Sequence, residues 1–312
     1  MTTYPVPYGI IIGAQKSAST FIQLVLADND ELVLGRNEEP FYERECLVGM
    51  GERYFLKKYN VDDKKLIIKR PNYFGSEIAA KNITKFAKES KLVLVLRNPI
   101  DRLRSAYFHY IRDGFIPNEE INYGLDKILS GAWIKKYPRS REIIDFSKYG
   151  KCFARYNEHY LNGNLLIVSH EDIKRRPELV IKKVSDFLSV NYSNTRSYEI
   201  RPQSVVYSHS RLNIYKVRNI FLYKYAKDKL TLEKRIAPLY LLGKIIESYD
   251  TIIASKFFSN NPPELDENIK SRLNEIFSKD LMNLRTILME GGKAEGAWSF
   301  IDDYMSNVCV TS

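Results

Sequence analysis

The sequence predicts an α/β fold with a central, mostly parallel sheet flanked by helices. Short runs rich in Ile, Val and Leu alternate with segments whose apolar residues recur at helical spacing. Strands that are apolar on both faces suit a parallel sheet covered by helices on each side. A chain of 312 residues with 44% hydrophobic residues can also bury one sizeable core. The predicted strands cover residues 8–12, 65–69, 92–96 and 165–169.

Helical periodicity predicts the elements between and after these strands. Pro99 suits the first turn of a helix, because its missing N–H would have no partner there in any case. Beyond about residue 211 no strand is predicted and helices dominate. We therefore expect one domain, 1–312, with an α/β core at 1–215 and a mainly helical C-terminal part at 216–312. The predicted helices cover residues 17–27, 76–89, 99–112, 150–161, 178–189 and 264–290.

Composition bounds the partners and the compartment. The 48 Lys and Arg outnumber the 38 Asp and Glu and give a net charge of +10, which favours an anionic partner or, equally well, an ordinary solvated basic surface. No apolar run is long enough for a membrane-spanning segment and no secretory leader is recognisable, so we expect a cytoplasmic protein. The cysteines lack the spacing of a disulfide framework or a zinc site, which predicts no metal. These cysteines are Cys46, Cys152 and Cys309.

A turn of small residues around one lysine follows the first predicted strand, in the stretch GAQKSASTFIQ at 13–23. A strand that leads through a loop into a helix directs several backbone N–H groups at one point, backed by the positive end of the helix dipole. Lys16 would add a mobile positive charge for a phosphate. The alternative is an ordinary serine cap beside a solvent-facing lysine. Lys16 follows Gly13 by only three residues, so the triphosphate-binding motif GxxxxGK is absent, as is GxGxxG.

A second anion site is predicted in LVLVLRNPIDRLRSAYFHYIR at 92–112. Arg97 follows a buried strand at the sheet edge where open α/β folds bind ligands, and its planar guanidinium suits a phosphate. The alternative is that Arg97 pairs with Asp101, while Arg102 and Arg104 decorate the helix surface.

Together the two segments resemble the nucleotide-binding motifs of sulfotransferases that use 3'-phosphoadenosine 5'-phosphosulfate (PAPS). In that family the first motif holds the 5'-phosphosulfate, and the Arg and Ser of the second, here Arg97 and Ser105, hold the 3'-phosphate. The resemblance implies a P-loop-like three-layer fold, PAPS as donor, adenosine 3',5'-bisphosphate as product and no metal. A downstream segment, SHSRLNI at 208–214, resembles a loop that closes over the nucleotide. The implied donor-binding residues are Gln15, Lys16, Ser17, Ala18, Ser19, Thr20, Arg97, Ser105, Ser210 and Arg211.

The segment NEEPFYE at 37–43 resembles the Lys-Glu-Pro-His-Phe-Phe segment of heparan-type and bacterial carbohydrate sulfotransferases, whose glutamate is the proposed catalytic base. Alignment on Pro40 gives that role to Glu39. Glu38 is a second carboxylate, so the assignment could shift by one residue. His109 is a further candidate base, although packing or a surface position suits its aromatic helix better.

Two lysines are implied to act on the reacting groups. KRPNYF at 69–74 resembles the family's Lys-Thr-Pro-x-Tyr-Phe segment, which places Lys69 near those groups. Lys16 would stabilise the negative charge that grows on the leaving oxygen. One departure concerns Ala18, where the family often has glycine: a methyl group is acceptable if this residue is helical, but not if its φ is positive.

We expect an enzyme that transfers a sulfuryl group from PAPS to an acceptor hydroxyl of a carbohydrate by in-line transfer. Two alternatives remain. A P-loop-type nucleotide kinase or NTPase is disfavoured by the short loop. A basic nucleic-acid-binding protein fits the total charge, but no known module supports it, so no nucleic-acid partner is expected.

Overall fold

The computed structural model describes residues 6–35, 37–61, 63–191, 205–226, 232–291, 301–302 and 304–306. These residues fall into two compact units. The first lies within 1–102, 148–201 and 276–312, and the second within 103–147 and 202–275. Each unit is described by itself below.

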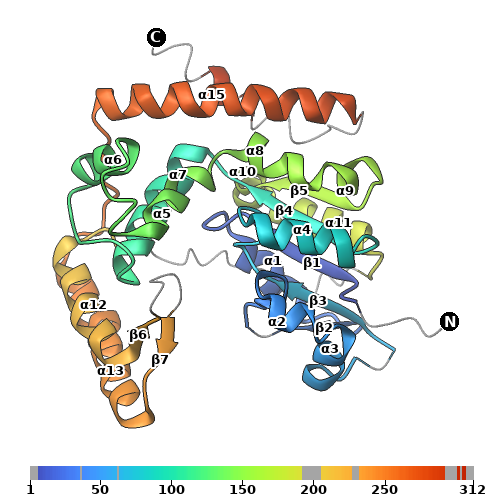
Figure 1. Ribbon diagram of the computed structural model, residues 1–312, viewed down its shortest axis with the longest axis horizontal. Helices are drawn as coiled ribbons and strands as arrows, with labels where there is room; N and C mark the ends of the chain where they lie inside the picture. Colours follow the sequence, from blue (N-terminus) through green and yellow to red (C-terminus); the bar gives the residue numbers. More distant parts are fainter. Residues whose placement is uncertain are drawn as a thin grey trace. The chain divides into compact units, whose positions relative to one another are not determined.

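The first unit is built on a five-stranded parallel sheet of order β2-β3-β1-β4-β5 (Figure 1). The central strand β1 pairs with β3 through Gly9 and Ile67 and with β4 through Gly9 and Lys91. The prediction of an α/β fold with a parallel sheet is confirmed. The strands are β1 (Gly9–Gly13), β2 (Leu32–Leu34), β3 (Lys65–Lys69), β4 (Lys91–Leu96) and β5 (Leu165–Ser169).

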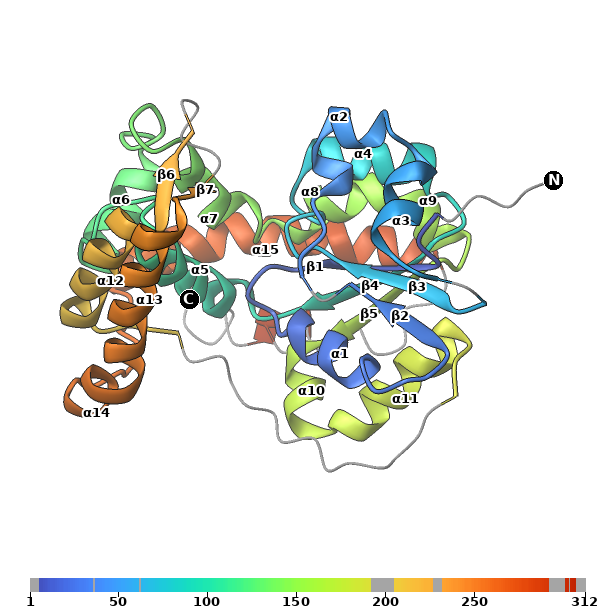
Figure 2. The ribbon, with the colours of Figure 1, turned by 90° about the horizontal axis from the view of Figure 1, so that it is seen from below.

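Helices cover both faces of this sheet (Figure 2). One face carries α1 (Ser19–Leu26), α10 (His170–Arg175) and α11 (Pro177–Leu188), and the other carries α4 (Glu77–Phe86), α8 (Tyr149–Phe153) and α9 (Asn157–Leu161). Because both faces are packed, the strands are apolar throughout, as their sequences predict. The core under α1, α10 and α11 comprises Ile11, Ile22, Leu26, Leu32, Ile67, Val93, Val95, Val168, Ile173, Val180, Val184, Leu188 and Val190.

Two local expectations for this unit were wrong. Strand β2 was not predicted, because three residues are too short to show a period. The helix predicted over 150–161 is divided into α8, the 3₁₀ turn η3 (Ala154–Tyr156) and α9. Two short helices, α2 (Glu45–Val48) and α3 (Glu52–Lys58), and the 3₁₀ turn η1 (Phe41–Glu43) lie between β2 and β3.

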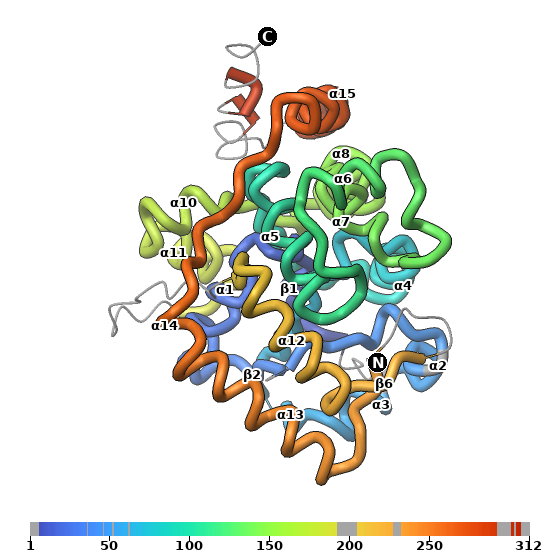
Figure 3. The backbone as a smooth tube through the Cα atoms, turned by 90° about the vertical axis from the view of Figure 1, so that its left-hand side faces the viewer, coloured from blue at the N-terminus to red at the C-terminus, as the bar shows by residue number. Residues whose placement is uncertain are grey.

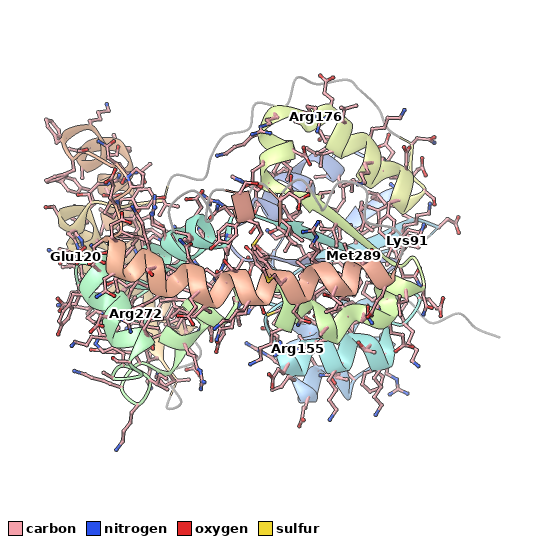
Figure 4. The ribbon with its side chains drawn as sticks, turned by 90° about the horizontal axis from the view of Figure 1, so that it is seen from above. Lys91, Glu120, Arg155, Arg176, Arg272 and Met289 are labelled. Carbon is pink, nitrogen blue, oxygen red and sulfur yellow. The ribbon has the colours of Figure 1, made fainter. Side chains whose placement is uncertain are left out.

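Two long helices contain residues of both units. The α5 helix (Pro99–Arg112) has the predicted bounds, and α15 (Glu267–Glu290) ends at the predicted residue. Figure 4 shows α15 with Arg272 and Met289 labelled near its two ends. In the first unit, the Asp280 carboxylate of α15 accepts from the N–H groups of Gly150 (2.7 Å) and Lys151 (2.9 Å) in α8. A β-carbon at Gly150 would meet the Asp280 carbonyl oxygen at 2.3 Å, so glycine permits this close approach.

The second unit is mainly helical. Helices α12 (His209–Leu222) and α13 (Ala237–Tyr249) run side by side (Figure 3). A short antiparallel hairpin of β6 (Tyr223–Tyr225) and β7 (Leu232–Lys234) joins them, so the prediction of no strand beyond residue 211 was wrong. Its three-residue strands carry no readable period. The other elements are α6 (Ile121–Leu129), η2 (Pro138–Arg141), α7 (Glu142–Asp145), the π-helical segment η4 (Asp250–Ala254) and α14 (Ser255–Phe257). Within the described residues, no helix is long and apolar enough to cross a bilayer.

Candidate active site

The carboxyl ends of three adjacent strands bring together the residues that both motifs predicted. Strand β1 lies between β3 and β4, so the loop after β1, the last residue of β3 and the residue after β4 share one sheet edge. These are the loop at 14–18, Lys69 and Arg97. Ligands bind at this edge in open parallel sheets.

The loop after β1 is a tight turn with two non-glycine residues in the left-handed region. Lys16 has φ 66° and Ala18 has φ 69°, immediately before helix α1. Gly13 has φ 150°, and a β-carbon there would meet the carbonyl oxygen of Pro71 at 2.7 Å. Ala18 is therefore not helical, although the family resemblance made a methyl group acceptable at this position only in a helical residue. The left-handed conformation of an alanine costs about 1–2 kcal/mol.

Arg102 holds this loop from inside the protein. Its side chain is fully buried, with Nε donating to the Gln15 carbonyl oxygen and Nη2 to Gln15 Oε1, each at 3.2 Å. Gln15 Nε2 donates in turn to Asn72 Oδ1 at 3.2 Å. The alternative that Arg102 decorates the helix surface was wrong. The amide of Gln15 positions the loop, and its predicted contact with the donor stays a prediction.

Arg97 reaches the loop at Lys16. Its Nη1 donates to the Lys16 carbonyl oxygen at 3.1 Å, and its own carbonyl accepts from the buried Tyr149 hydroxyl at 2.8 Å. No ion pair between Arg97 and Asp101 occurs among the described residues. The two predicted anion sites therefore adjoin. Ser105 lies one turn beyond Arg102 on α5 and is buried, and its contact with the donor stays a prediction.

Several polar groups around the loop suit an anionic ligand. Among the described residues, no side chain caps the N-terminus of α1, so its first N–H groups remain available. Arg97 Nε is buried without a hydrogen-bond partner, and buried Ser17 Oγ makes no well-aligned hydrogen bond. Buried donors of this kind are costly unless a ligand or water satisfies them. Ser19 is buried and Thr20 half-buried at the start of α1.

Lys69 lies against the start of α1. Its Nζ donates to Thr20 Oγ1 at 2.8 Å, and the residue is buried. Burial lowers the pKa of Lys69, and the nearby Glu38 carboxylate partly opposes that effect. A desolvated cation beside a helix N-terminus can neutralise negative charge on a bound anion more strongly than an exposed one.

Glu39 is enclosed. Its carboxylate is fully buried and accepts from the Tyr54 hydroxyl at 2.8 Å, the Tyr59 hydroxyl at 2.9 Å and Lys58 Nζ at 2.5 Å. The N–H of Phe41 also donates to it, at 3.2 Å. Burial, followed by the neighbouring Glu39, raises the pKa of Tyr59. Glu39 thus connects two elements. Its carboxylate binds side chains at α3, and its N–H donates to the Lys69 carbonyl oxygen at the end of β3, at 2.9 Å.

Glu38 faces the other way. Its side chain is 45% exposed and its Oε2 accepts from Arg70 Nη1 at 2.9 Å. It is also close enough to Lys69 to influence the pKa of that lysine. Of the two neighbouring carboxylates, Glu38 is therefore the solvent-accessible one.

The remaining predicted residues lie in the second unit. The Arg211 guanidinium makes two hydrogen bonds to the buried Asp250 carboxylate, at 2.9 and 2.8 Å, and Ser210 is exposed beside it on α12. His109 Nε2 lies 3.6 Å from Asp113 Oδ2. The roles of Ser210 and Arg211 in donor binding stay predictions.

Some residues that shape the site gave no signal in the sequence. Tyr149 supports Arg97 from a distant helix, and Asn72 holds the Gln15 side chain. Arg70, which binds Glu38 and Glu43, lies in the KRPNYF segment, where only Lys69 was predicted to have a role. Among the described residues there is no cluster of three or more potential metal ligands. Of the cysteines considered in the sequence analysis, Cys309 lies outside the described residues, and the side chain of Cys46 is not described.

Comparison with known proteins gives one consistent result. Residues 9–235 match the family described as "Sulfotransferase domain". The chain is 24% identical over 188 residues to mouse heparan sulfate glucosamine 3-O-sulfotransferase 3A1, covering 59% of this chain and 46% of that protein. It is 24% identical over 209 residues to mouse bifunctional heparan sulfate N-deacetylase/N-sulfotransferase 4, covering 62% of this chain and 24% of that protein. The chain therefore spans less than half the length of these relatives.

A solved structure supports the fold. The sulfotransferase from Alicyclobacillus acidocaldarius superimposes with a TM-score of 0.59 at 16% sequence identity, covering 91% of this chain and 96% of that one. At this identity the likeness concerns the fold alone.

The left-handed conformation of Ala18 yields a test. We expect Ala18→Gly to raise the free energy of unfolding by about 0.5–1 kcal/mol, because relief of the left-handed strain exceeds the added entropy of the unfolded chain. Ala27→Gly is the matched control: Ala27 is exposed with φ −66°, and the same change should lower stability by about 0.5–1 kcal/mol. Urea unfolding measures both. Equal destabilisation by the two changes would contradict the conformation of the loop.

Proposed function

Because this chain belongs to the sulfotransferase domain family, we propose that it transfers a sulfuryl group from PAPS to an acceptor hydroxyl. The match over residues 9–235 confirms the resemblance inferred from two short motifs. The observation that best supports PAPS as the donor is the hydrogen bond from Arg97 Nη1 to the Lys16 carbonyl oxygen. It places an arginine directly beside a phosphate-type loop, as a nucleotide with phosphates at both its 3' and 5' positions requires.

The loop and Arg97 would hold the two ends of the donor. The open N-terminus of α1, with Ser17, Ser19 and Thr20, would receive the 5'-phosphosulfate. The orphaned Nε of Arg97 would bind the 3'-phosphate, and Ser105 would assist it. When bound, the donor supplies an activated sulfuryl group whose S–O bond to phosphate breaks as a new S–O bond forms to the acceptor oxygen.

The chain's own residues would lower the barrier by charge and proton transfer. Lys16, at the loop apex, and Lys69, beside Thr20, would stabilise negative charge on the departing phosphate oxygen. A carboxylate would take the proton of the acceptor hydroxyl, a step worth about 100- to 10,000-fold in rate. The reaction then leaves adenosine 3',5'-bisphosphate and a sulfated acceptor.

The geometry favours Glu38 as this base over Glu39, which the sequence comparison selected. Glu39 is buried among donors that occupy its carboxylate, whereas Glu38 is accessible and near Lys69. Because Glu38 is exposed and Glu39 is buried, alignment by one residue decides between an accessible and an interior carboxylate. The Glu39 assignment remains a prediction that the same experiment tests.

For the acceptor, we propose a carbohydrate hydroxyl. The support is the resemblance of the 37–43 and 69–74 segments to those of carbohydrate sulfotransferases, together with relatives named for heparan sulfate. The basic surface of the chain also suits an acidic glycan. Three further points stay predictions: that the protein binds no nucleic acid, that it needs no metal, and that it is cytoplasmic.

Donor recognition is tested by calorimetry. We expect adenosine 3',5'-bisphosphate to bind about 10- to 100-fold more tightly than 5'-AMP, because a charge-assisted contact to the 3'-phosphate is worth about 1.5–3 kcal/mol. Arg97→Ala should remove most of this preference. Arg175→Ala, an exposed arginine on α10, should leave it unchanged. Equal affinity of the native protein for both nucleotides would exclude the proposed donor.

The base is tested by a matched pair of substitutions. We expect Glu38→Gln to lower kcat about 100- to 10,000-fold with the fold unchanged, because the accessible carboxylate is lost. Glu39→Gln should instead lower the free energy of unfolding by about 2–3 kcal/mol, because a buried acceptor of charged and phenolic donors is lost. Glu178→Gln, exposed on α11, is the control. Full activity of Glu38→Gln together with inactive but stable Glu39→Gln would return the role to Glu39.

The acceptor is tested with labelled PAPS and panels of oligosaccharides, lipids, small alcohols and tyrosine peptides. We expect a mass gain of one SO3 group on oligosaccharides and a loss of transfer in Lys16→Ala. Transfer to another class alone would overturn the carbohydrate assignment while leaving the enzyme class intact.

A further inference from the structure

The helical segment from α13 to α14 carries apolar side chains on two opposite faces. Its inner face packs on α12, where a β-carbon at Gly243 would meet Leu222 Cδ2 at 2.4 Å. Seven residues after Gly243, the Asp250 carboxylate accepts two hydrogen bonds from the Arg211 guanidinium of α12, at 2.9 and 2.8 Å. These contacts fix which side of the segment faces the second unit.

The opposite side is exposed and apolar. At 100° per residue, Leu241, Leu242, Ile245 and Tyr249 of α13 fall within about a third of the helix circumference, on the side away from Gly243. Ile252 and Ile253 follow in the π-helical segment η4 and are also exposed. Ile245 is 58% exposed and Ile252 is 61% exposed, which is unusual for such side chains. We call this set the outer face: Leu241, Leu242, Ile245, Tyr249, Ile252 and Ile253.

Basic side chains lie beside the outer face. Lys234 Nζ and Lys244 Nζ lie 5.6 and 5.8 Å from the centre of the Tyr240 ring of α13, and Lys256 is exposed on α14. Two acidic groups of this region are paired: Asp250 with Arg211, and Glu247 with Arg218 and Lys244. Glu233 lies opposite Lys224 in the hairpin. The exposed basic residues are Lys216, Lys224, Lys234, Arg235, Lys244 and Lys256.

We propose that the outer face docks on an anionic lipid bilayer. An apolar helix face bordered by lysines is the pattern of helices that lie in a membrane interface, with apolar side chains among the acyl chains and lysines at the headgroups. A second copy of the chain is a poorer occupant. A two-fold contact would place the basic borders of both copies around one interface, and like charges gathered in this way are unfavourable. Docking would be peripheral, and it does not depend on the proposed chemistry.

Sedimentation with vesicles tests the proposal. We expect the native protein to pellet with vesicles of phosphatidylcholine and phosphatidylglycerol and far less with phosphatidylcholine alone. Ile245→Glu combined with Ile252→Glu should lower this partition at least about tenfold, because charged groups would enter the apolar layer. Lys234→Gln combined with Lys256→Gln should lower it about fivefold for each charge removed, and added salt should weaken it.

The matched control is Ile78→Glu combined with Leu179→Glu, which changes two side chains of similar exposure, 55% and 59%, in the first unit. Its vesicle binding should equal that of the native protein. Failure of the native protein to bind anionic vesicles would overturn the proposal, as would equal loss in the control. A dimer in light scattering that Ile245→Glu dissociates, without vesicle binding, would assign the face to a second copy instead.

Discussion

The candidate site depends on the placement of β1 between β3 and β4. Parallel neighbours end at the same edge, so the loop after β1, Lys69 and Arg97 converge although they are far apart in the sequence. Arg97 then fixes its distance to the loop by donating to the Lys16 carbonyl oxygen, and buried Arg102 holds Gln15 from below. Arg97 and Arg102 are positioned by backbone partners, and Lys69 is positioned by the Thr20 hydroxyl. The site can therefore present positive charge to a ligand without a large rearrangement.

Four strands of the parallel sheet and the helices α1, α4, α5, α11 and α15 could be predicted, because their apolar patterns extend over enough residues to be recognised. Strands of three residues, β2, β6 and β7, could not, because so few residues carry no period. The helix expected at 150–161 is divided, and one of its pieces takes partners from Asp280 at the far end of the chain. Such long-range contacts override local propensity.

The motifs identified the elements that meet at the candidate site, but not the conformations or partners that define them. No local pattern shows that Ala18 is left-handed. The choice between Glu38 and Glu39 depends on Tyr54, Lys58 and Tyr59, which enclose one carboxylate from a later helix. Arg211 matches a donor-binding segment in sequence, yet its guanidinium is bound to Asp250, 39 residues later. Sequence resemblance therefore predicted which residues lie near one another at the end of the sheet, while the roles of these residues stay predictions.

Gly13 links the loop to the segment that follows β3. A β-carbon there would meet the Pro71 carbonyl oxygen at 2.7 Å and Phe74 Cβ at 2.9 Å, so the two backbones touch with nothing between them. Any bulk added at this position would push apart the segments that carry Lys16 and Lys69. The spacing of the two lysines thus depends on the absence of a side chain at Gly13. A redesign of the donor preference would have to change both segments together.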